Sequence, residues 1–402
     1  MPGRDRIQPY SHTATTITMR LTLSLLRALV CLMPLAAFWG CSGPPTKTES
    51  KPVTYYPASP AAPRLQLLAT FSGEQDLGGG PSKFATFVVG KEPILKPIGK
   101  PYGVALHGGK MYVCDTGASA IDIMDLQTRE FRYFTSSGEG KLVTPINIAI
   151  DGDGTRYVAD SARGQILVFG RDDVYQGAIG GRLSGPGRAH SHLPAEPLPA
   201  ETEGDDSIKP TDVQISGNRL YVTDLKGRCV RAYEKTTRKL LFTMPRDAAS
   251  ADTKSRLFTP TNLAVDSAGR IYVSDLGAFR VQQYAPDGTF LRQFGQGAGD
   301  KPGDFARPTG VAVDRQGRVY VVDAATQVVQ VFDNEGKLLL FFGEMQGASP
   351  GLDLPAKVAV DYEHTGLFAS YAAPDFVIEN LVLVTSQIGE RKVSVFGFGH
   401  KK

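Results

Sequence analysis

The sequence predicts an all-β protein: a six-bladed β-propeller of four-stranded antiparallel blades, closed by an N-terminal strand that completes the last blade. Two repeated patterns carry this prediction. A unit of the form Pro-x-x-apolar-x-apolar occurs six times, and its copies begin at Pro101, Pro145, Pro210, Pro260, Pro308 and Pro355. Five copies are followed by a second strand of the form Tyr-Val-x-Asp, which ends at Asp115, Asp160, Asp224, Asp275 and Asp323. A repeat of this length with strand-like content is typical of propeller blades.

The third and fourth strands of each blade follow from shorter signals. Apolar runs at 166–169, 281–284 and 329–332 predict third strands, and 288–294 and 336–342 predict fourth strands. Gly and Asp residues separate the strands, as expected for tight hairpins. Four antiparallel strands per repeat make one blade.

The last repeat lacks its own fourth strand. After its first strand comes an insertion at 362–380, and 381–385 and 392–396 then predict its second and third strands. The chain ends before a fourth strand can form, whereas 64–71 reads as a fourth strand with no preceding three. We expect 64–71 to complete this blade and close the ring, which removes an exposed sheet edge. The propeller domain therefore spans 64–402.

The N-terminal region predicts export and a lipid anchor. Basic residues precede an apolar run that ends at Gly40, so 1–40 is expected to be a signal peptide; Met19 is an alternative start. Cys41 follows directly and is the expected lipidation site, with an ordinary signal peptide or an uncleaved anchor as the alternatives. Ser42 after this cysteine favours the outer membrane of a bacterium, with the propeller in the periplasm or at the cell surface. The Pro-rich stretch 41–63 is expected to be an extended tether.

Residues 294–314 carry a resemblance to a known family. They read Phe-Gly-Gln-Gly-Ala-Gly-Asp-Lys-Pro-Gly-Asp-Phe-Ala-Arg-Pro-Thr-Gly-Val-Ala-Val-Asp and resemble the NHL repeat. The Tyr-Val-x-Asp strands extend the likeness over roughly 64–400. The resemblance implies a six-bladed propeller but no single activity, since this fold hosts unrelated functions. Similar exported NHL lipoproteins imply a role in assembly of the envelope or of exported cytochromes.

Strand order predicts where a partner would bind. The repeated prolines, the repeated aspartates and the long connections 72–100, 180–209 and 244–259 all lie at one end of the antiparallel strands. Loops on a rigid scaffold are where recognition usually occurs. We therefore expect a monomeric scaffold, rather than an enzyme, that binds a protein or glycan of the cell envelope and needs no cofactor. The candidate contact residues on this face are Tyr102, Arg163, Lys226, Arg228, Arg280 and Lys357. A net charge of +3 gives no basis for nucleic-acid binding.

A metal-dependent hydrolase is the alternative function. The second residue after each strand-one proline should approach the channel mouth, and three consecutive repeats place Asn147, Asp212 and Asn262 there. These oxygens suit a divalent cation, and the arrangement is similar to the cation site of gluconolactonase and lactonase propellers. The further acidic ligand of those enzymes has no match in this sequence. We interpret the five repeated aspartates as turn residues that bond backbone amides, not as catalytic acids.

Overall fold

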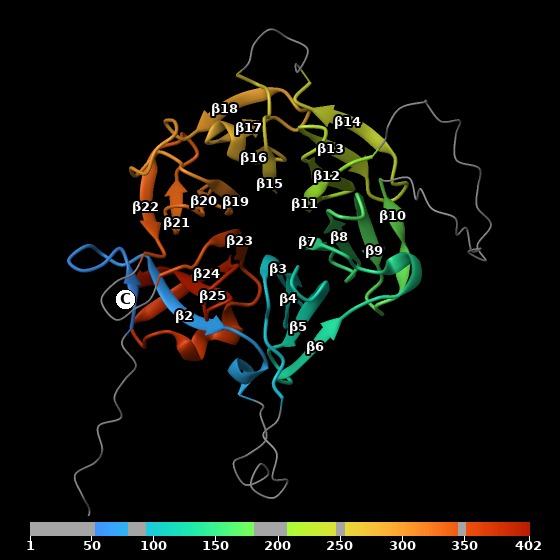
Figure 1. Cartoon of the computed structure of the whole chain (residues 1–402). Coiled ribbons are helices and arrows are strands. Elements are labelled where there is room, and N and C mark those ends of the chain that lie inside the picture. Colours follow the sequence, from blue (N-terminus) through green and yellow to red (C-terminus); the bar gives the residue numbers. More distant parts are fainter. Residues whose placement is uncertain (1–52, 79–93, 181–206, 247–253, 345–350) are drawn as a thin grey trace, which may run out of the picture. The chain divides into compact units, whose positions relative to one another are not determined.

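The described part of the chain forms six antiparallel sheets arranged around a ring (Figure 1). The computed structural model describes residues 53–78, 94–180, 207–246, 254–344 and 351–402. Five sheets have four strands in sequence order, and the sixth combines strands from both ends of the chain. The predicted six-bladed propeller is confirmed.

Each blade begins at a repeated proline on its innermost strand. Blades 1 to 3 consist of β3 (Pro101–His107), β4 (Lys110–Asp115), β5 (Ala120–Asp125) and β6 (Glu130–Phe134); β7 (Pro145–Ile150), β8 (Arg156–Asp160), β9 (Gln165–Phe169) and β10 (Tyr175–Ile179); and β11 (Pro210–Ser216), β12 (Arg219–Asp224), β13 (Cys229–Glu234) and β14 (Leu240–Met244). Blades 4 to 6 consist of β15 (Pro260–Val265), β16 (Ile271–Asp275), β17 (Arg280–Tyr284) and β18 (Phe290–Phe294); β19 (Pro308–Val313), β20 (Val319–Asp323), β21 (Val328–Phe332) and β22 (Leu338–Phe342); and β23 (Pro355–Asp361), β24 (Phe376–Ser386), β25 (Val393–Lys401), β2 (Leu65–Phe71) and β1 (Tyr55–Tyr56).

The hydrophobic core lies between blades, not at one centre. Six buried apolar clusters each join two neighbouring blades around the ring. Between blades 4 and 5, for example, the ring centroids of Phe294 and Phe332 are 6.3 Å apart. Because both faces of a blade are covered, second strands such as β16 and β20 are buried at every position. This explains why these strands are apolar at consecutive positions and do not alternate.

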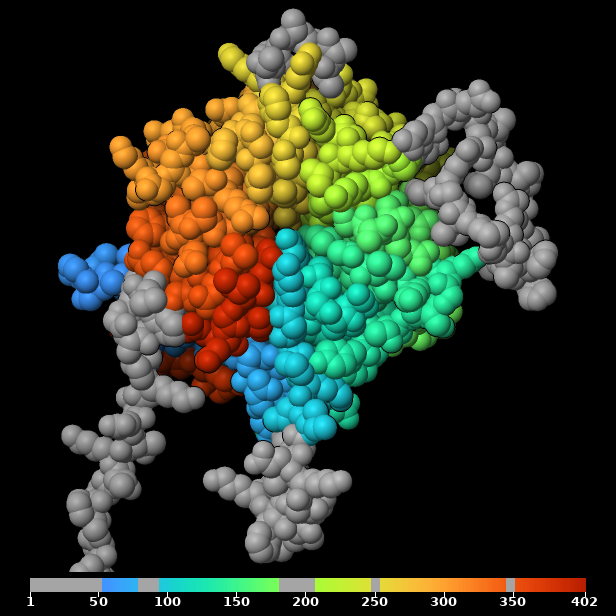
Figure 2. Space-filling model, viewed as in Figure 1, coloured from blue at the N-terminus to red at the C-terminus, as the bar shows by residue number. Residues whose placement is uncertain are grey.

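The N-terminal strand closes the ring as predicted. β2 pairs with β25 from Leu65 opposite Phe398 to Phe71 opposite Val393. In the space-filling view, the blue N-terminal residues lie where the red residues of blade 6 meet the cyan residues of blade 1 (Figure 2). The closing strand therefore supports the seam between the first and last repeats.

The packed domain begins earlier than the predicted boundary at residue 64. β1 adds a short fifth strand to blade 6, with Tyr56 opposite Leu65. Tyr56 is 1% exposed, and its ring lies 6.1 Å from that of Phe342 and 6.0 Å from that of Phe396. The prolines of this stretch suggested an extended tether throughout, but its two tyrosines bury apolar area on the blade. Residues 1–52, including the predicted signal peptide and Cys41, lie outside the described residues.

The insertion in blade 6 is shorter than expected. It contains the short helix η4 (Thr365–Tyr371), and β24 already starts at Phe376, where it pairs with Lys401. The side chain of Gln66 on β2 bonds the backbone of Tyr371 and Ala373. These bonds hold the insertion against the outer strand of its own blade. The other short helices are η1 (Glu74–Leu77), η2 (Gly138–Gly140) and η3 (Leu276–Ala278).

Ring closure predicts a sharp difference between two truncated chains. A chain that starts at residue 72 loses the buried side chains of Tyr56, Leu65 and Phe71, each stabilising by about 1.5–3 kcal/mol. It should aggregate or unfold at a much lower temperature than a chain that starts at residue 53, as followed by circular dichroism. Equal melting temperatures for the two chains would contradict the closure.

Candidate functional site

The repeated aspartates organise the face of the ring at which the inner strands begin, hereafter the proline face. Asp115 is buried, and its carboxylate accepts hydrogen bonds from Gly99 and Lys100 at 2.6 and 2.9 Å and from Gly117 and Ala118 at 2.8 and 3.1 Å. The first pair of amides belongs to the connection that enters the blade, and the second to the turn after β4. The turn interpretation is confirmed, and each aspartate also fixes the incoming connection. Corresponding bonds to both segments are made by Asp160, Asp224 and Asp323. Asp275 accepts hydrogen bonds from the incoming connection, at Phe258 and Thr259, but not from the turn that follows it.

Blade 6 has no aspartate at the equivalent position, and a serine holds the incoming connection there. Pro355 pairs with Ser386, whose hydroxyl oxygen accepts a hydrogen bond from the backbone of Asp353 at 3.2 Å. A neutral hydroxyl replaces the carboxylate there, and the turn is further held by the bond from Gln387 to Leu354.

A second carboxyl group lies beside Asp115 in blade 1. Asp122 on β5 occupies the register position that Arg231 occupies on β13. In blade 3, Arg231 donates to Asp224 at 2.9 Å, so the two charges neutralise each other. In blade 1 the neighbour is another acid. Burial, together with the charge of Asp115, raises the pKa of Asp122 to about 9, so Asp122 is a neutral acid at physiological pH.

Six equivalent inner positions meet at the channel axis. They are the second residues after the strand-one prolines: Gly103, Asn147, Asp212, Asn262, Gly310 and Lys357. A Cβ atom on Gly103 would lie 2.4 Å from Oδ1 of Asn147, and one on Gly310 would lie 2.8 Å from Cα of Lys357. The glycines therefore make room for the four polar side chains.

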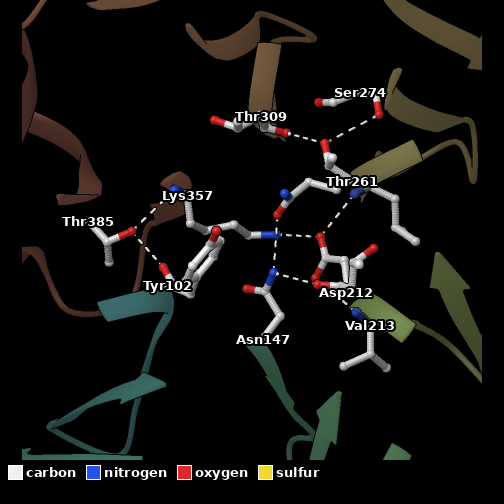
Figure 3. A network of polar contacts seen from close by, with 12 residues as sticks. Tyr102, Asn147, Asp212, Val213, Thr261, Ser274, Thr309, Lys357 and Thr385 are labelled. Carbon is white, nitrogen blue, oxygen red and sulfur yellow. Dashed lines mark hydrogen bonds and ion pairs between the residues drawn. The ribbon is translucent and has the colours of Figure 1, made fainter. Parts of the chain in front are cut away.

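The polar side chains converge on a buried ion pair between opposite blades (Figure 3). The ammonium group of Lys357 bonds Asp212, and both side chains are almost fully buried. The same carboxylate accepts hydrogen bonds from the backbone of Val213 at 2.8 Å and Leu263 at 2.9 Å. Burial raises the pKa of Asp212, whereas the Lys357 ammonium and these amides favour its charged form.

This arrangement does not fit a divalent cation. Asn147, Asp212 and Asn262 do come together, since the Asn147 amide donates to Oδ1 of Asn262 at 3.1 Å. The oxygens of Asp212 and Asn262, however, already accept hydrogen bonds, from Lys357 and two backbone amides and from Asn147, respectively. The Lys357 ammonium supplies the positive charge that a metal would supply. Nor do the described residues contain any group of three or more His, Cys, Asp or Glu side chains suited to a metal.

The ion pair closes one end of the channel. On its other side the channel widens to a cavity of about 310 Å³, lined mainly by aliphatic residues of the six inner strands. Its ionisable lining residues are Lys357 and Asp361, and Asp361 bonds the imidazole of His364 at 2.9 Å. The cavity wall thus offers few side chains for acid–base chemistry.

The predicted partner residues differ in their surroundings. Lys226 and Arg228 are exposed in the turn after β12. Arg163 and Arg280 instead bond carbonyl oxygens of incoming connections, at Lys141 and Arg256. Tyr102 is half-buried, and its carbonyl accepts a bond from Thr385. Lys357 does not lie on this surface, because its side chain extends into the channel to Asp212. Most of the predicted recognition loops, at 79–93, 181–206 and 247–253, lie outside the described residues.

Taken together, these features define a six-bladed β-propeller whose channel is closed by its own side chains. The family model described as the NHL repeat matches residues 305–332, so blade 5 of this six-bladed propeller carries an NHL repeat. No curated protein matches the sequence.

Solved structures with a similar fold include enzymes of two kinds. A streptogramin B lyase is 12% identical, with a TM-score of 0.47 over 76% of this chain and 85% of that chain. A virginiamycin B lyase from Staphylococcus aureus with quinupristin is 11% identical, with a TM-score of 0.48 over 75% of this chain and 95% of that chain. A gluconolactonase from Xanthomonas campestris is 15% identical, with a TM-score of 0.49 over 87% of this chain and 95% of that chain. At these identities the likeness concerns the fold alone.

The buried ion pair predicts a large effect of removing one partner. Lys357→Met leaves the Asp212 carboxylate buried without its counter-charge, which should lower the free energy of unfolding by about 3–5 kcal/mol. The double variant Lys357→Met/Asp212→Asn should recover much of this loss, because no charge remains. Urea unfolding of the three proteins measures both effects. A double variant less stable than the single one would refute the pairing.

The neutral Asp122 predicts a pH-dependent stabilisation. Its pKa is raised on folding, from an ordinary value of 3.8 to about 9. The folded state therefore binds the proton more tightly, and stability falls as pH rises from about 4 to about 9, by at most about 1.4 kcal/mol per pH unit. Asp122→Asn removes the titrating group and with it this loss. Urea unfolding should therefore show that the stability difference between the variant and the wild type is more in favour of the variant at pH 8 than at pH 5. Parallel pH profiles would contradict the assignment.

Proposed function

We propose that the chain is an exported, lipid-anchored scaffold of the cell envelope that binds a partner protein on its proline face. The closed channel carries this proposal. A propeller enzyme acting at the channel needs a reachable polar centre, whereas here Lys357 and Asp212 satisfy each other in the interior. The alternative of a metal-dependent lactonase is not favoured, since its oxygen ligands are used inside the protein.

The described chain begins at the outer edge of blade 6, where β1 pairs with the first residues of β2. The proposed tether would therefore join the propeller at the rim of the ring and not at its channel. No helix among the described residues is long and apolar enough to cross a membrane, and Cys41 is the proposed attachment point.

Site-directed photo-cross-linking in cells tests this function. The photoreactive residue p-benzoylphenylalanine replaces Arg228 on the proline face or, as a control, Leu291 on the outer strand β18. Both residues are exposed. We expect one discrete protein adduct from position 228 and none from position 291. The adduct should diminish in Cys41→Ser, which should also lose the labelled fatty acid that the wild type incorporates.

Two outcomes would contradict the scaffold. One is the same adducts from both positions, because recognition would then not be confined to the proline face. The other is a tight, stoichiometric calcium or zinc site in calorimetry that is lost in Asp212→Ala, which would favour the hydrolase. Binding of an envelope polysaccharide without any protein adduct would assign the face to a glycan.

A further inference from the structure

One aromatic residue of the proline face has an unfavourable backbone conformation and an exposed ring. Phe279 has a φ of 55°, in the left-handed region, and is 39% exposed. A bulky residue in this region is strained. The strain is not matched by full burial, since Phe279 remains 39% exposed. Such a combination is typical of functional positions.

The other blades show that the fold does not require this side chain. Phe279 directly precedes the third strand, in a turn that adopts the same conformation in five blades. The equivalent residues have φ values from 50° to 66°: Ser119, Gly164, Arg228, Phe279 and Gln327. Blade 2 uses glycine here, which adopts a positive φ without strain. The turn therefore requires the backbone conformation of Phe279, but it does not require an aromatic side chain at this position.

A second exposed aromatic residue lies beside the same turn. Phe258 is 44% exposed and precedes the inner strand of blade 4, where its backbone bonds Asp275 at 2.9 Å. The turn packs closely against it, because a Cβ atom on Gly277 would lie 3.2 Å from Cβ of Phe258. Phe258 therefore lies close to η3, the turn that ends at Phe279, and these two exposed residues are hereafter called the Phe258–Phe279 patch.

The face that carries this patch is rich in positive charge. On the proline face of blades 3 to 5, within the described residues, exposed cations outnumber exposed acids. The cations are Lys209, Lys226, Arg228, Arg246, Lys254, Arg256, Lys301 and Arg307, and the acids are Asp300 and Glu344. The aspartates at the turns of these blades are fully buried and accept backbone amides, so they are not accessible to a ligand on this face. An aromatic centre with a polar, charged rim is the usual composition of a protein-binding hot spot.

We propose that the Phe258–Phe279 patch binds an acidic segment of the partner protein, with one apolar side chain of that segment packed between the two phenyl rings. The proposal rests on the proposed function and specifies the chemistry of its partner. The cations attract the acidic segment, and the rings supply the contact that distinguishes it from other acidic chains. A polysaccharide or a single-stranded nucleic acid would be a different occupant, and the test separates them.

The test uses the full chain and fluorescent acidic dodecapeptides that carry one central Trp, Phe or Leu. Matched peptides carry Ser at that position. The wild type should bind the apolar peptides at least about tenfold more tightly than the Ser peptides, and more weakly at high salt. Phe279→Gly and Phe258→Ser should each lower this affinity about tenfold or more.

Two control variants separate binding from folding. Gln327→Gly makes the same backbone change in the equivalent turn of blade 5, where Gln327 has a φ of 61°. Leu291→Ser removes an equally exposed apolar residue from the blade rim. Phe279→Gly and Gln327→Gly should both raise the melting temperature or leave it unchanged. Only Phe279→Gly should lose peptide affinity, and Leu291→Ser should keep it.

Several results would overturn the proposal. They are equal affinity for Trp and Ser peptides, an unchanged affinity in Phe279→Gly, a lowered melting temperature in Phe279→Gly, or tighter binding of oligo-dT or of an acidic polysaccharide than of any peptide. If the cross-linked partner still binds Phe279→Gly normally, the proposed function stands and this patch is not its site. If no protein is cross-linked at position 228, the proposed binding of a partner protein fails, whatever the peptides show.

Discussion

The fold of this propeller depends on hydrogen bonds between buried carboxylates at the ends of the second strands and the backbone amides around them. In blade 1, the Asp115 carboxylate holds the incoming connection and the following turn at the same time. A blade covered on both faces has no solvent for its polar groups, so they must be satisfied at the strand ends. The five repeated aspartates meet this requirement, so their carboxylates are not available to bind another molecule. The proposed recognition therefore depends on side chains that vary between the blades.

Buried polar groups must also be satisfied at the channel axis. Six inner strands bring six side chains so close together that two of the positions are glycine. The others must neutralise one another, because an unpaired buried charge is strongly destabilising. Asp212 and Lys357 achieve this across the ring, and Asn147 and Asn262 complete the hydrogen bonds. A propeller that binds a metal leaves this charge to the ion; here a lysine provides it, and the axis becomes part of the structural core.

Repetition explains which features could be predicted from the sequence. The prolines and Tyr-Val-x-Asp strands recur, so the six blades, the closing strand and the turn role of the aspartates could all be predicted. The contact of Tyr56 with Phe342 and Phe396 occurs once, among prolines that suggest an extended chain. The pairing of Lys357 with Asp212 joins residues 145 positions apart. A signal for it was nevertheless present, since opposite charges occupy equivalent positions of blades 3 and 6, which face each other in a six-membered ring.

Departures from the repeat distinguish structural from functional roles better than the repeat itself does. Asp122 and Phe279 each occupy a position where another blade has a less costly residue, Arg231 in the first case and Gly164 in the second. Asp122 is fully buried, so it affects the protein through stability and its dependence on pH. Phe279 is exposed, so its ring can contact another molecule. Because the equivalent blades provide internal references, the cost of each departure can be measured within this single chain. The fold does not explain the cost at Phe279, and this is the reason for proposing that blade 4 binds the partner.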